Sequence, residues 1–371
     1  MRSIVIPSSV TKICQYAFYY CDKLRKVEFS KNSKIERIEK FSFSASSIQS
    51  LSIPSSIIEL QDGWCHEASH LFEIKTFENG KINVKNFGDE MMIGKSDTNE
   101  ENFDVLLFVS RNVKKTLIPS SIKKMSSYCF SRSYIQNITI PKSVTQICEN
   151  SFFHCESLQK VEFEENSELH IIEKSVFSNS SIEYLSIPSS VVELKECWCY
   201  ETPKLNEINV FYNEKVNIKK SNDDLLIGKT DINCKDFDVL LFASRNVEKT
   251  IIPSSIKIIS SYSFSNSTIK SISIPKSVTQ INEGAFYFCF QLQNVEIEND
   301  SNLQLIGKYA FAYSSIESIR ITSKVTQIGD NSFDYCENLQ IIEFSSSSGL
   351  NLNDKSLFTT CSQVIIMIPC K

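Results

Sequence analysis

The sequence lacks several features that define common functional classes. Its longest apolar runs, such as residues 105–109 and 364–368, are far shorter than the roughly 20 residues that a membrane-spanning helix needs. Its 39 Lys and Arg are balanced by 44 Asp and Glu and form no basic block, so we expect neither a nucleic-acid partner nor an electrostatic membrane anchor. With only 4 histidines and no G-x-S-x-G motif, it offers no candidates for hydrolysis. We therefore expect no enzyme activity and no cofactor.

The two ends of the sequence lack a secretory signal and the polar caps that would cover the first and last strands. The start, MRSIVIPSSV, contains no apolar segment of a secretory signal. We therefore expect either that the protein is not secreted by the signal-peptide route or that its natural N-terminus lies further upstream. The chain opens and closes on apolar strand-like residues, 3–6 and 364–368, without polar caps. We expect incomplete ends and edge-to-edge self-association through the exposed strands.

Two motifs that suggest ligand binding are incomplete. Residues 88–96, GDEMMIGKS, resemble a phosphate-binding loop but place five residues between the glycines instead of four. Cys65, His66 and His70 offer three metal-ligand side chains, but the matching residues of the next copy are Cys199, Tyr200 and Lys204. We interpret both histidines as surface residues and expect no metal site.

Cysteine is abundant, but its count of 13 is odd, which excludes a complete intramolecular disulfide framework. Five cysteines share an F-x-x-C spacing at one position of a repeat, where a small apolar side chain packs inside a coil. This pattern favours buried free thiols, with disulfides or metal ligands as the alternative. The five pairs are Phe18/Cys21, Phe152/Cys155, Phe286/Cys289, Phe333/Cys336 and Phe358/Cys361.

A repeated unit organises the whole chain. Residues 140–163, IPKSVTQICENSFFHCESLQKVEF, return with the same apolar positions at 6–29 and 274–297. The unit is too short to enclose its own apolar side chains, so it must stack on its neighbours as a solenoid. The strand-closing anchors are Ile6, Phe29, Ile53, Thr76, Ile118, Ile140, Phe163, Ile187, Val210, Ile252, Ile274, Ile297, Ile321, Phe344 and Ile368.

Anchor spacing predicts a single solenoid domain over residues 1–371. The steps are 23, 24, 23, 42 and 22 residues, repeated once, which divides the chain into super-repeats at 7–140, 141–274 and 275–371. Each anchor ends a short alternating segment typical of a half-buried strand, and proline often follows it. A second short extended piece follows the proline, and the segment after it, N-S-F-F-H-C in residues 150–155, is short enough for one helical turn. In two coils Trp64-Cys65 and Trp198-Cys199 replace the Ala-Phe pair, which conserves volume and indicates repacking, not a site.

The two long steps contain insertions, at about 77–112 and 211–246. Each carries paired apolar runs, 91–93 with 105–108 and 225–227 with 239–242, separated by polar turns. This pattern predicts a β-hairpin inserted into a coil with its tip in solvent.

The repeat I-P-x-x-V-x-x-I-x-x-x-A-F-x-x-C-x-x-L-x-x-V-x-F resembles the BspA-like, Treponema-type leucine-rich repeat over essentially the whole chain. The LLIGK and FDVLLFASRN strings of the insertions look like those of BspA-like surface antigens of protozoan parasites. The resemblance implies a curved stack with a parallel sheet on the concave side and short helical turns or extended pieces on the convex side. It also implies a surface adhesion or antigen module that binds host or matrix protein, with no catalytic residue. An intracellular scaffold or structural repeat protein is the alternative, with a cytoplasmic location. N-x-S/T sequons at Asn137, Asn179, Asn266 and Asn299 matter only if the chain is secreted.

The expected binding site is the outward row of the strands, because side chains alternate across a strand. Tyr184 is the expected anchor of this face. The competing interpretation is a merely solvated face, and the competing site is the pair of hairpin tips at 95–102 and 229–235. The candidate residues are Lys26, Glu28, Lys160, Glu162, Tyr184, Ser186, Glu207, Asn209, Asn294, Glu296, Arg320 and Glu343.

Overall fold

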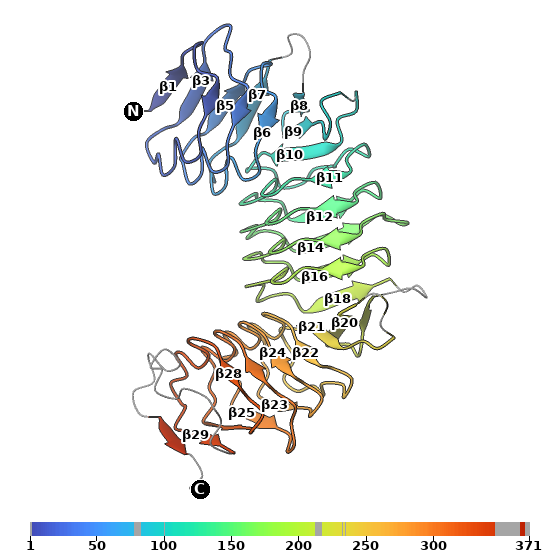
Figure 1. Cartoon of the computed structure of the whole chain (residues 1–371). Coiled ribbons are helices and arrows are strands. Elements are labelled where there is room, and N and C mark those ends of the chain that lie inside the picture. The colour runs from blue at the N-terminus through green and yellow to red at the C-terminus, as the bar shows by residue number, and fades with distance from the viewer. Residues whose placement is uncertain are drawn as a thin grey trace. The chain divides into compact units, whose positions relative to one another are not determined.

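The computed structural model describes residues 2–77, 83–99, 101–211, 217–231, 233, 235–345 and 364–367. Their contacts group into two compact units, Met1–Cys199 and Tyr200–Lys371. Within each unit the chain winds as a β-solenoid with parallel sheets, as the repeat predicts (Figure 1). The prediction of one continuous domain over all 371 residues stays a prediction.

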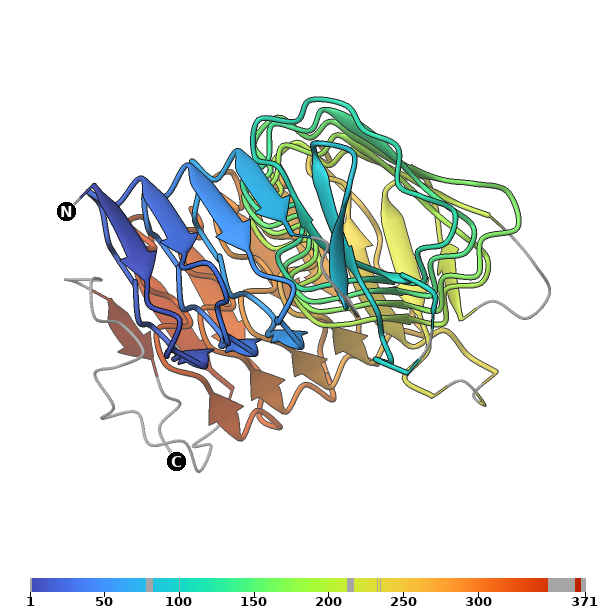
Figure 2. The same cartoon turned by 90° about the horizontal axis from the view of Figure 1, so that it is seen from above.

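Each coil has three sides: a long strand of usually four residues, a short strand of two residues, and a segment of turns. Figure 2 shows the long and short strands of the first coils, in blue, as separate layers. The long strands of the first unit are β1 (Ser3–Ile6), β3 (Lys26–Phe29), β5 (Ser50–Ile53), β7 (Glu73–Thr76), β12 (Asn137–Ile140), β14 (Lys160–Phe163) and β16 (Tyr184–Ile187). Its short strands are β2 (Lys12–Ile13), β4 (Arg37–Ile38), β6 (Glu59–Leu60), β11 (Lys124–Met125), β13 (Gln146–Ile147), β15 (Ile171–Ile172) and β17 (Glu193–Leu194).

The second unit repeats this arrangement. Its long strands are β18 (Glu207–Val210), β23 (Ser271–Ile274), β25 (Asn294–Ile297), β27 (Ser318–Ile321), β29 (Ile341–Phe344) and β30 (Ile365–Met367). Its short strands are β22 (Ile258–Ile259), β24 (Gln280–Ile281), β26 (Leu305–Ile306) and β28 (Gln327–Ile328). Neighbouring long strands pair in parallel, with Ser271 opposite Asn294 and Ile272 opposite Val295.

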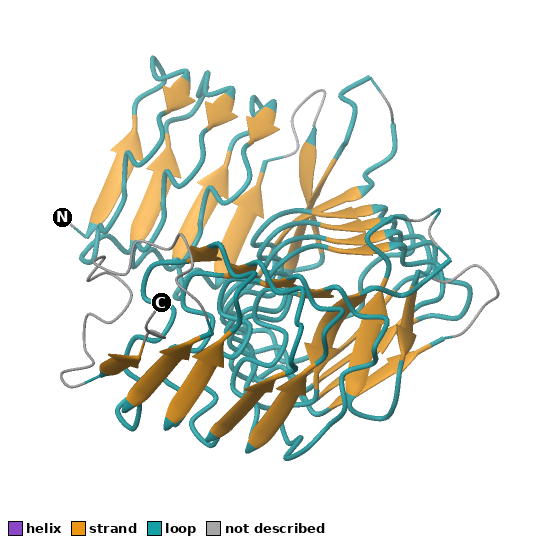
Figure 3. Cartoon of the chain, turned by 60° about the horizontal axis from the view of Figure 1, so that its bottom comes forward, coloured by secondary structure: helices purple, strands orange, loops and turns teal. Residues whose placement is uncertain are grey.

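The third side of each coil is a run of turns, not the helical turn that segment length allowed. No residue in the described part of the chain is helical, and Figure 3 shows strands and loops only. Successive N–H groups alternate between two acceptors: Ala17 N–H bonds to Cys14 O in its own coil, and Phe18 N–H bonds to Ser42 O of the next. This alternation gives the backbone N–H groups of the turns hydrogen-bond acceptors in their own coil and in the next coil. An isolated helical turn would leave several of these groups without an acceptor.

A stack of phenylalanine rings fills the core beneath these turns. Phe130 and Phe152 stack with centroids 4.9 Å apart, and Phe286 and Phe311 stack at 5.1 Å with planes 3° apart. The F-x-x-C cysteines lie beside them; Cys155 and Cys289 are fully buried, which confirms the predicted buried thiols there. Cys21 is half-buried, and Cys361 lies outside the described residues.

The insertions form antiparallel strands, as predicted, but they contain one strand more than the sequence pattern indicated. In the first unit these are β8 (Val84–Phe87), β9 (Met91–Gly94) and β10 (Val105–Val109), and in the second β19 (Ile218–Lys220), β20 (Leu225–Gly228) and β21 (Val239–Ala243). β10 also pairs in parallel with β11, and β21 with β22. The last strand of each insertion therefore belongs to the short-strand sheet of the solenoid.

Two predicted strand anchors, Ile118 and Ile252, do not lie in strands. Both are buried, but each directly follows a strongly exposed apolar side chain: Leu117 is 85% exposed and Ile251 84% exposed. In each of these coils the last strand of the insertion joins the short-strand sheet, and none of the described residues of the coil joins the long-strand sheet. The long-strand sheet is therefore interrupted here. Ile368 lies outside the described residues, and the other anchors end long strands.

Candidate functional site

The candidate residues of the first unit lie on the outward face of its long strands. Val27 and Val161 point into the coils and are fully buried, whereas Lys26 and Glu28 on β3, and Lys160 and Glu162 on β14, reach solvent. The register places Lys160 beside Tyr184 of the neighbouring strand β16. The predicted alternation is therefore present, with one exception: Ser186 is only 3% exposed.

Charged side chains on this face pair along single strands. Lys26 and Glu28 lie 2.7 Å apart, Lys75 and Glu73 2.6 Å, and Lys160 and Glu162 2.9 Å. All six are well exposed, so each pair contributes little to stability. Their consequence is a face that carries both signs of charge at regular intervals.

Tyr184 lies within this charged row. The Lys160 ammonium is 5.2 Å from the centroid of the Tyr184 ring, within range of a cation–π interaction. Tyr184 is half-buried and the Lys160–Glu162 pair is next to it. An aromatic ring held by a lysine and flanked by a carboxylate can contact apolar and charged groups of one ligand.

The second unit presents a corresponding row of exposed polar residues. Glu207 and Asn209 on β18, Asn294 and Glu296 on β25, and Arg320 on β27 are all exposed. Arg320 lies opposite Glu343 of β29, with 3.8 Å between the guanidinium and the carboxylate.

A cleft of about 860 Å³ opens where the long-strand sheet of the first unit is interrupted. Glu73 and Lys75 of β7 line one side, and Asn86, Glu90 and Lys114 line the rest with their neighbours. Positive and negative groups are mixed within it. The sequence pattern does not predict this cleft, because the interruption after β7 depends on how the insertion pairs.

Side chains of the insertion seal the edge of β7. Asn86 Nδ2 donates to Ile74 O at 2.6 Å, and the Ser110 hydroxyl donates to Phe72 O. The second unit repeats the second bond, with Ser244 Oγ donating to Asn206 O at 2.9 Å. These bonds occupy carbonyl groups that a strand from another chain would otherwise use.

The competing site, the hairpin tips, is only partly within the described residues. Before the tip, Ser96 donates from both N–H and Oγ to the buried Asp104 at 2.9 and 2.7 Å, and Thr230 does the same to Asp238. Near its base, Phe103 is contacted by two ammonium groups, those of Lys85 at 4.1 Å and Lys95 at 5.2 Å from the ring centroid. These bonds hold the base of the tip, and the exposed residues 97–99 lie beyond them.

Two buried arginines were also missed. Arg111 and Arg245 are each 1% exposed and lie in identical S-R-N-V strings. Arg111 Nη1 donates to Cys129 O at 3.0 Å, and its guanidinium lies 4.5 Å from the centroid of the Phe108 ring. Arg245 Nη1 donates to Ser263 O at 2.8 Å and lies equally close to the Phe242 ring. These arginines bond the turn carbonyls where the phenylalanine stack is broken, which is a structural role.

The prediction that both histidines lie at the surface is confirmed for His70 and wrong for His66. His70 is exposed, but His66 is half-buried between Tyr128, at 4.3 Å between centroids, and Phe41, at 5.7 Å. Burial lowers the pKa of His66 to about 4. Within the described ranges no cluster of three or more His, Cys, Asp or Glu is arranged to hold a metal ion.

Comparison with known proteins identifies the repeat. The profile described as "BspA type Leucine rich repeat region (6 copies)" matches residues 1–103, 101–221 and 236–369. No curated protein sequence matches the chain at a significant level. In the parts of the chain that the structure describes, no helix is long and apolar enough to cross a membrane.

The solved structures that match the chain include two with a similar fold. The pneumococcal vaccine antigen PcpA is 20% identical with a TM-score of 0.58, over 93% of this chain and 72% of that one. A leucine-rich cell surface protein from Faecalibacterium prausnitzii is 19% identical with a TM-score of 0.63, over 99% of this chain and 87% of that one.

Proposed function

Since the chain belongs to the BspA-type leucine-rich repeat family, we propose that it is an adhesion or antigen module that binds a host or matrix protein at a cell surface. Leucine-rich repeat proteins generally bind other proteins, and the matching solved structures include a vaccine antigen and a cell surface protein. These likenesses support the general class, whereas surface display and adhesion are our proposal.

The outward face of the long strands is the proposed contact surface. The observation that carries it is the group formed by Tyr184, Lys160 and Glu162, in which a ring, an ammonium and a carboxylate lie side by side. Aromatic residues in the middle of a polar face contribute most to protein binding, and a rigid sheet holds them in place. The cleft beside β7 would accept a projecting side chain or loop of the same partner.

Binding of the full chain to host cells or immobilised matrix protein tests this surface. Tyr184→Ala combined with Glu162→Lys should weaken binding by roughly tenfold or more, as expected for an aromatic contact residue. Tyr134→Ala is the matched control, because Tyr134 is 52% exposed and is not among the outward row. Shortening the connections between β9 and β10 and between β20 and β21 tests the competing site. Loss of binding in that variant alone would reject the long-strand face.

The alternative is an intracellular scaffold or structural repeat protein. Localisation of the full-length product with a C-terminal tag, together with its glycosylation state, separates the two proposals. Asn137 in β12 and Asn299 are exposed and accessible to glycosylation enzymes if the chain enters the secretory route. A cytoplasmic product without glycans would support the scaffold. Self-association through the end strand β1 stays a prediction that sedimentation can check.

A further inference from the structure

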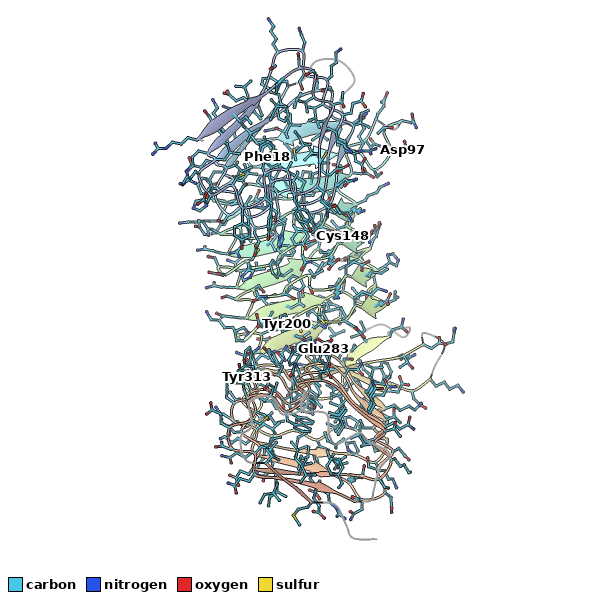
Figure 4. All side chains as sticks on the ribbon, turned by 60° about the vertical axis from the view of Figure 1, so that its left-hand side comes forward. Phe18, Asp97, Cys148, Tyr200, Glu283 and Tyr313 are labelled. Carbon is cyan, nitrogen blue, oxygen red and sulfur yellow. The ribbon has the colours of Figure 1, made fainter. Side chains whose placement is uncertain are left out.

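The turn side of the second unit carries a continuous cluster of aromatic rings at its surface. Tyr313 stacks on Tyr335 with centroids 4.4 Å apart and planes 10° apart, and Phe288 packs against Tyr313 at 4.7 Å and Phe290 at 5.4 Å. Tyr287 joins the cluster through Phe288 at 4.1 Å. Phe290 is 61% exposed and Tyr335 45% exposed, so the cluster is not part of the core. Figure 4 labels Tyr313 within it.

Several of these aromatic residues occupy a backbone conformation that disfavours them. Phe288, Tyr313 and Tyr335 have φ of 59°, 61° and 54°, at the same turn position of three successive coils. Asn266, Asn179 and His154 stand at this position in other coils, and Tyr20 does so in the first unit, so the turn accepts an aromatic ring without requiring one.

A small pocket lies within the cluster. It has a volume of about 180 Å³ and is lined by Phe290, Tyr313, Tyr335, Ser315, Glu337 and Asn338 among others. Rings form several of its walls, and Glu337 is exposed and supplies a carboxylate at its rim. Aromatic faces with a nearby carboxylate are the environment that attracts an alkylammonium or guanidinium group.

The charge around the cluster also favours a cationic ligand. The turn segments that carry it, residues 282–291, 307–316 and 329–338, contain Glu283, Asp330, Asp334 and Glu337 but only one basic residue, Lys308. Lys308 already places its ammonium 4.8 Å from the centroid of the neighbouring Tyr309 ring. This contact shows that a tyrosine face on this side of the unit accepts a lysine.

We propose that this aromatic, acidic turn surface is a second binding site, which takes a basic segment of a protein partner and seats a Lys or Arg side chain against Phe290, Tyr313 and Tyr335 beside Glu337. The site shares no residue with the outward face of the long strands. A test of this site is therefore independent of the function proposed above.

Fluorescence anisotropy of the full chain with labelled peptides tests the site. The probes are a peptide of alternating glycine and lysine and its counterpart of glycine and glutamate. We expect preference for the lysine peptide, and a roughly two- to fivefold loss of its affinity in Tyr335→Ala and in Glu337→Gln, as for a cation–π contact near the surface. Tyr335→Phe should retain binding, because the ring and not the hydroxyl contacts the cation. Thermal unfolding of each variant verifies folding, and Glu337→Gln should leave the backbone conformation unchanged because the side chain is exposed and keeps its size.

Glu296→Gln is the matched control, since it removes the same charge from β25 on another side of the same unit. It should leave affinity for the lysine peptide unchanged, as should Tyr184→Ala. Equal loss in Glu296→Gln would reduce the effect to net charge and overturn the proposal. So would equal binding of the two peptides. Competition by a neutral oligosaccharide, together with loss of binding in Tyr335→Phe, would identify a sugar site instead.

Discussion

Arg111 and Cys65 meet inside the first unit, where the Arg111 Nη2 lies 3.5 Å from the Cys65 Sγ. In the regular coils a phenylalanine occupies the position of Cys65 and stacks on its neighbours. The small cysteine leaves room for the guanidinium, while Trp64 packs edge-on against Phe43 at 6.1 Å and ends the stack. The Trp-Cys pair thus repacks the coil, as its volumes suggested, but around an arginine that is distant in sequence.

This relationship predicts coupling between the two positions. Cys65→Phe alone should lower the free energy of unfolding by about 1–3 kcal/mol, because the ring has no space beside Arg111. Arg111→Ala alone should be destabilising because it leaves a cavity and unpaired buried carbonyls. In the double variant the ring fills the vacated space, so we expect a loss smaller than the sum by at least about 0.5 kcal/mol in denaturant titrations. Cys65→Phe with Arg37→Ala, at an exposed arginine, should instead be additive.

Phe152→Ala should lower the free energy of unfolding by about 3–5 kcal/mol. The ring is fully buried and stacks on both Phe130 and Phe177. Because coils contact mainly their neighbours, hydrogen exchange should increase first in the coils next to it. Phe290→Ala, at an exposed ring, should change stability little. Uniform loss of protection across the first unit would contradict this local response.

Stability should fall as the pH drops from about 6.5 towards 4, because of His66. Its pKa in the folded chain is about 4, lowered first by burial and further by Arg132, Arg111 and His154, while Glu67 acts in the opposite direction. The unfolded chain therefore binds more protons than the folded chain in this window, and acid favours unfolding. After allowance for partial exposure, we expect a loss of roughly 1–2 kcal/mol.

His66→Phe tests this origin of the pH dependence. The variant should show a flatter stability profile between pH 6.5 and 4 than the parent chain. The exposed His70→Ala is the matched control and should keep the original slope. An unchanged slope in His66→Phe would assign the acid sensitivity to other groups.

Thiol reactivity should differ sharply among the described cysteines. Burial raises the pKa of Cys155 and of Cys289 to about 11, and each Sγ donates to a carbonyl of the neighbouring coil at 3.1 Å. At pH 8 in the folded chain, alkylation followed by peptide mapping should modify the exposed Cys14 and leave these two unmodified until denaturant is added. Rapid native labelling of Cys155 would show that its coil opens readily.

The candidate site was predictable only in part. Alternation along Leu158–Phe163 correctly assigned Lys160 and Glu162 to the outward face, because side-chain direction in a strand follows from position alone. Alternation could not show that Ser186 is buried or that Lys160 lies on the Tyr184 ring. Burial and side-chain contact depend on the neighbouring strands, which lie about 23 residues away in sequence.

The repeat, most of the strands and the buried phenylalanines and thiols follow from the sequence, because a short unit with a regular apolar pattern has to stack to bury it. Where that regularity ends depends on the tertiary structure. β10 pairs with β11 where the long-strand sheet ends after β7, and the cleft lies beside β7 at this break. The tertiary structure also brings Arg111 against Cys65 and places Tyr313 against Tyr335 at the surface. These contacts join residues from different coils, and no local pattern specifies them because each depends on how successive coils align.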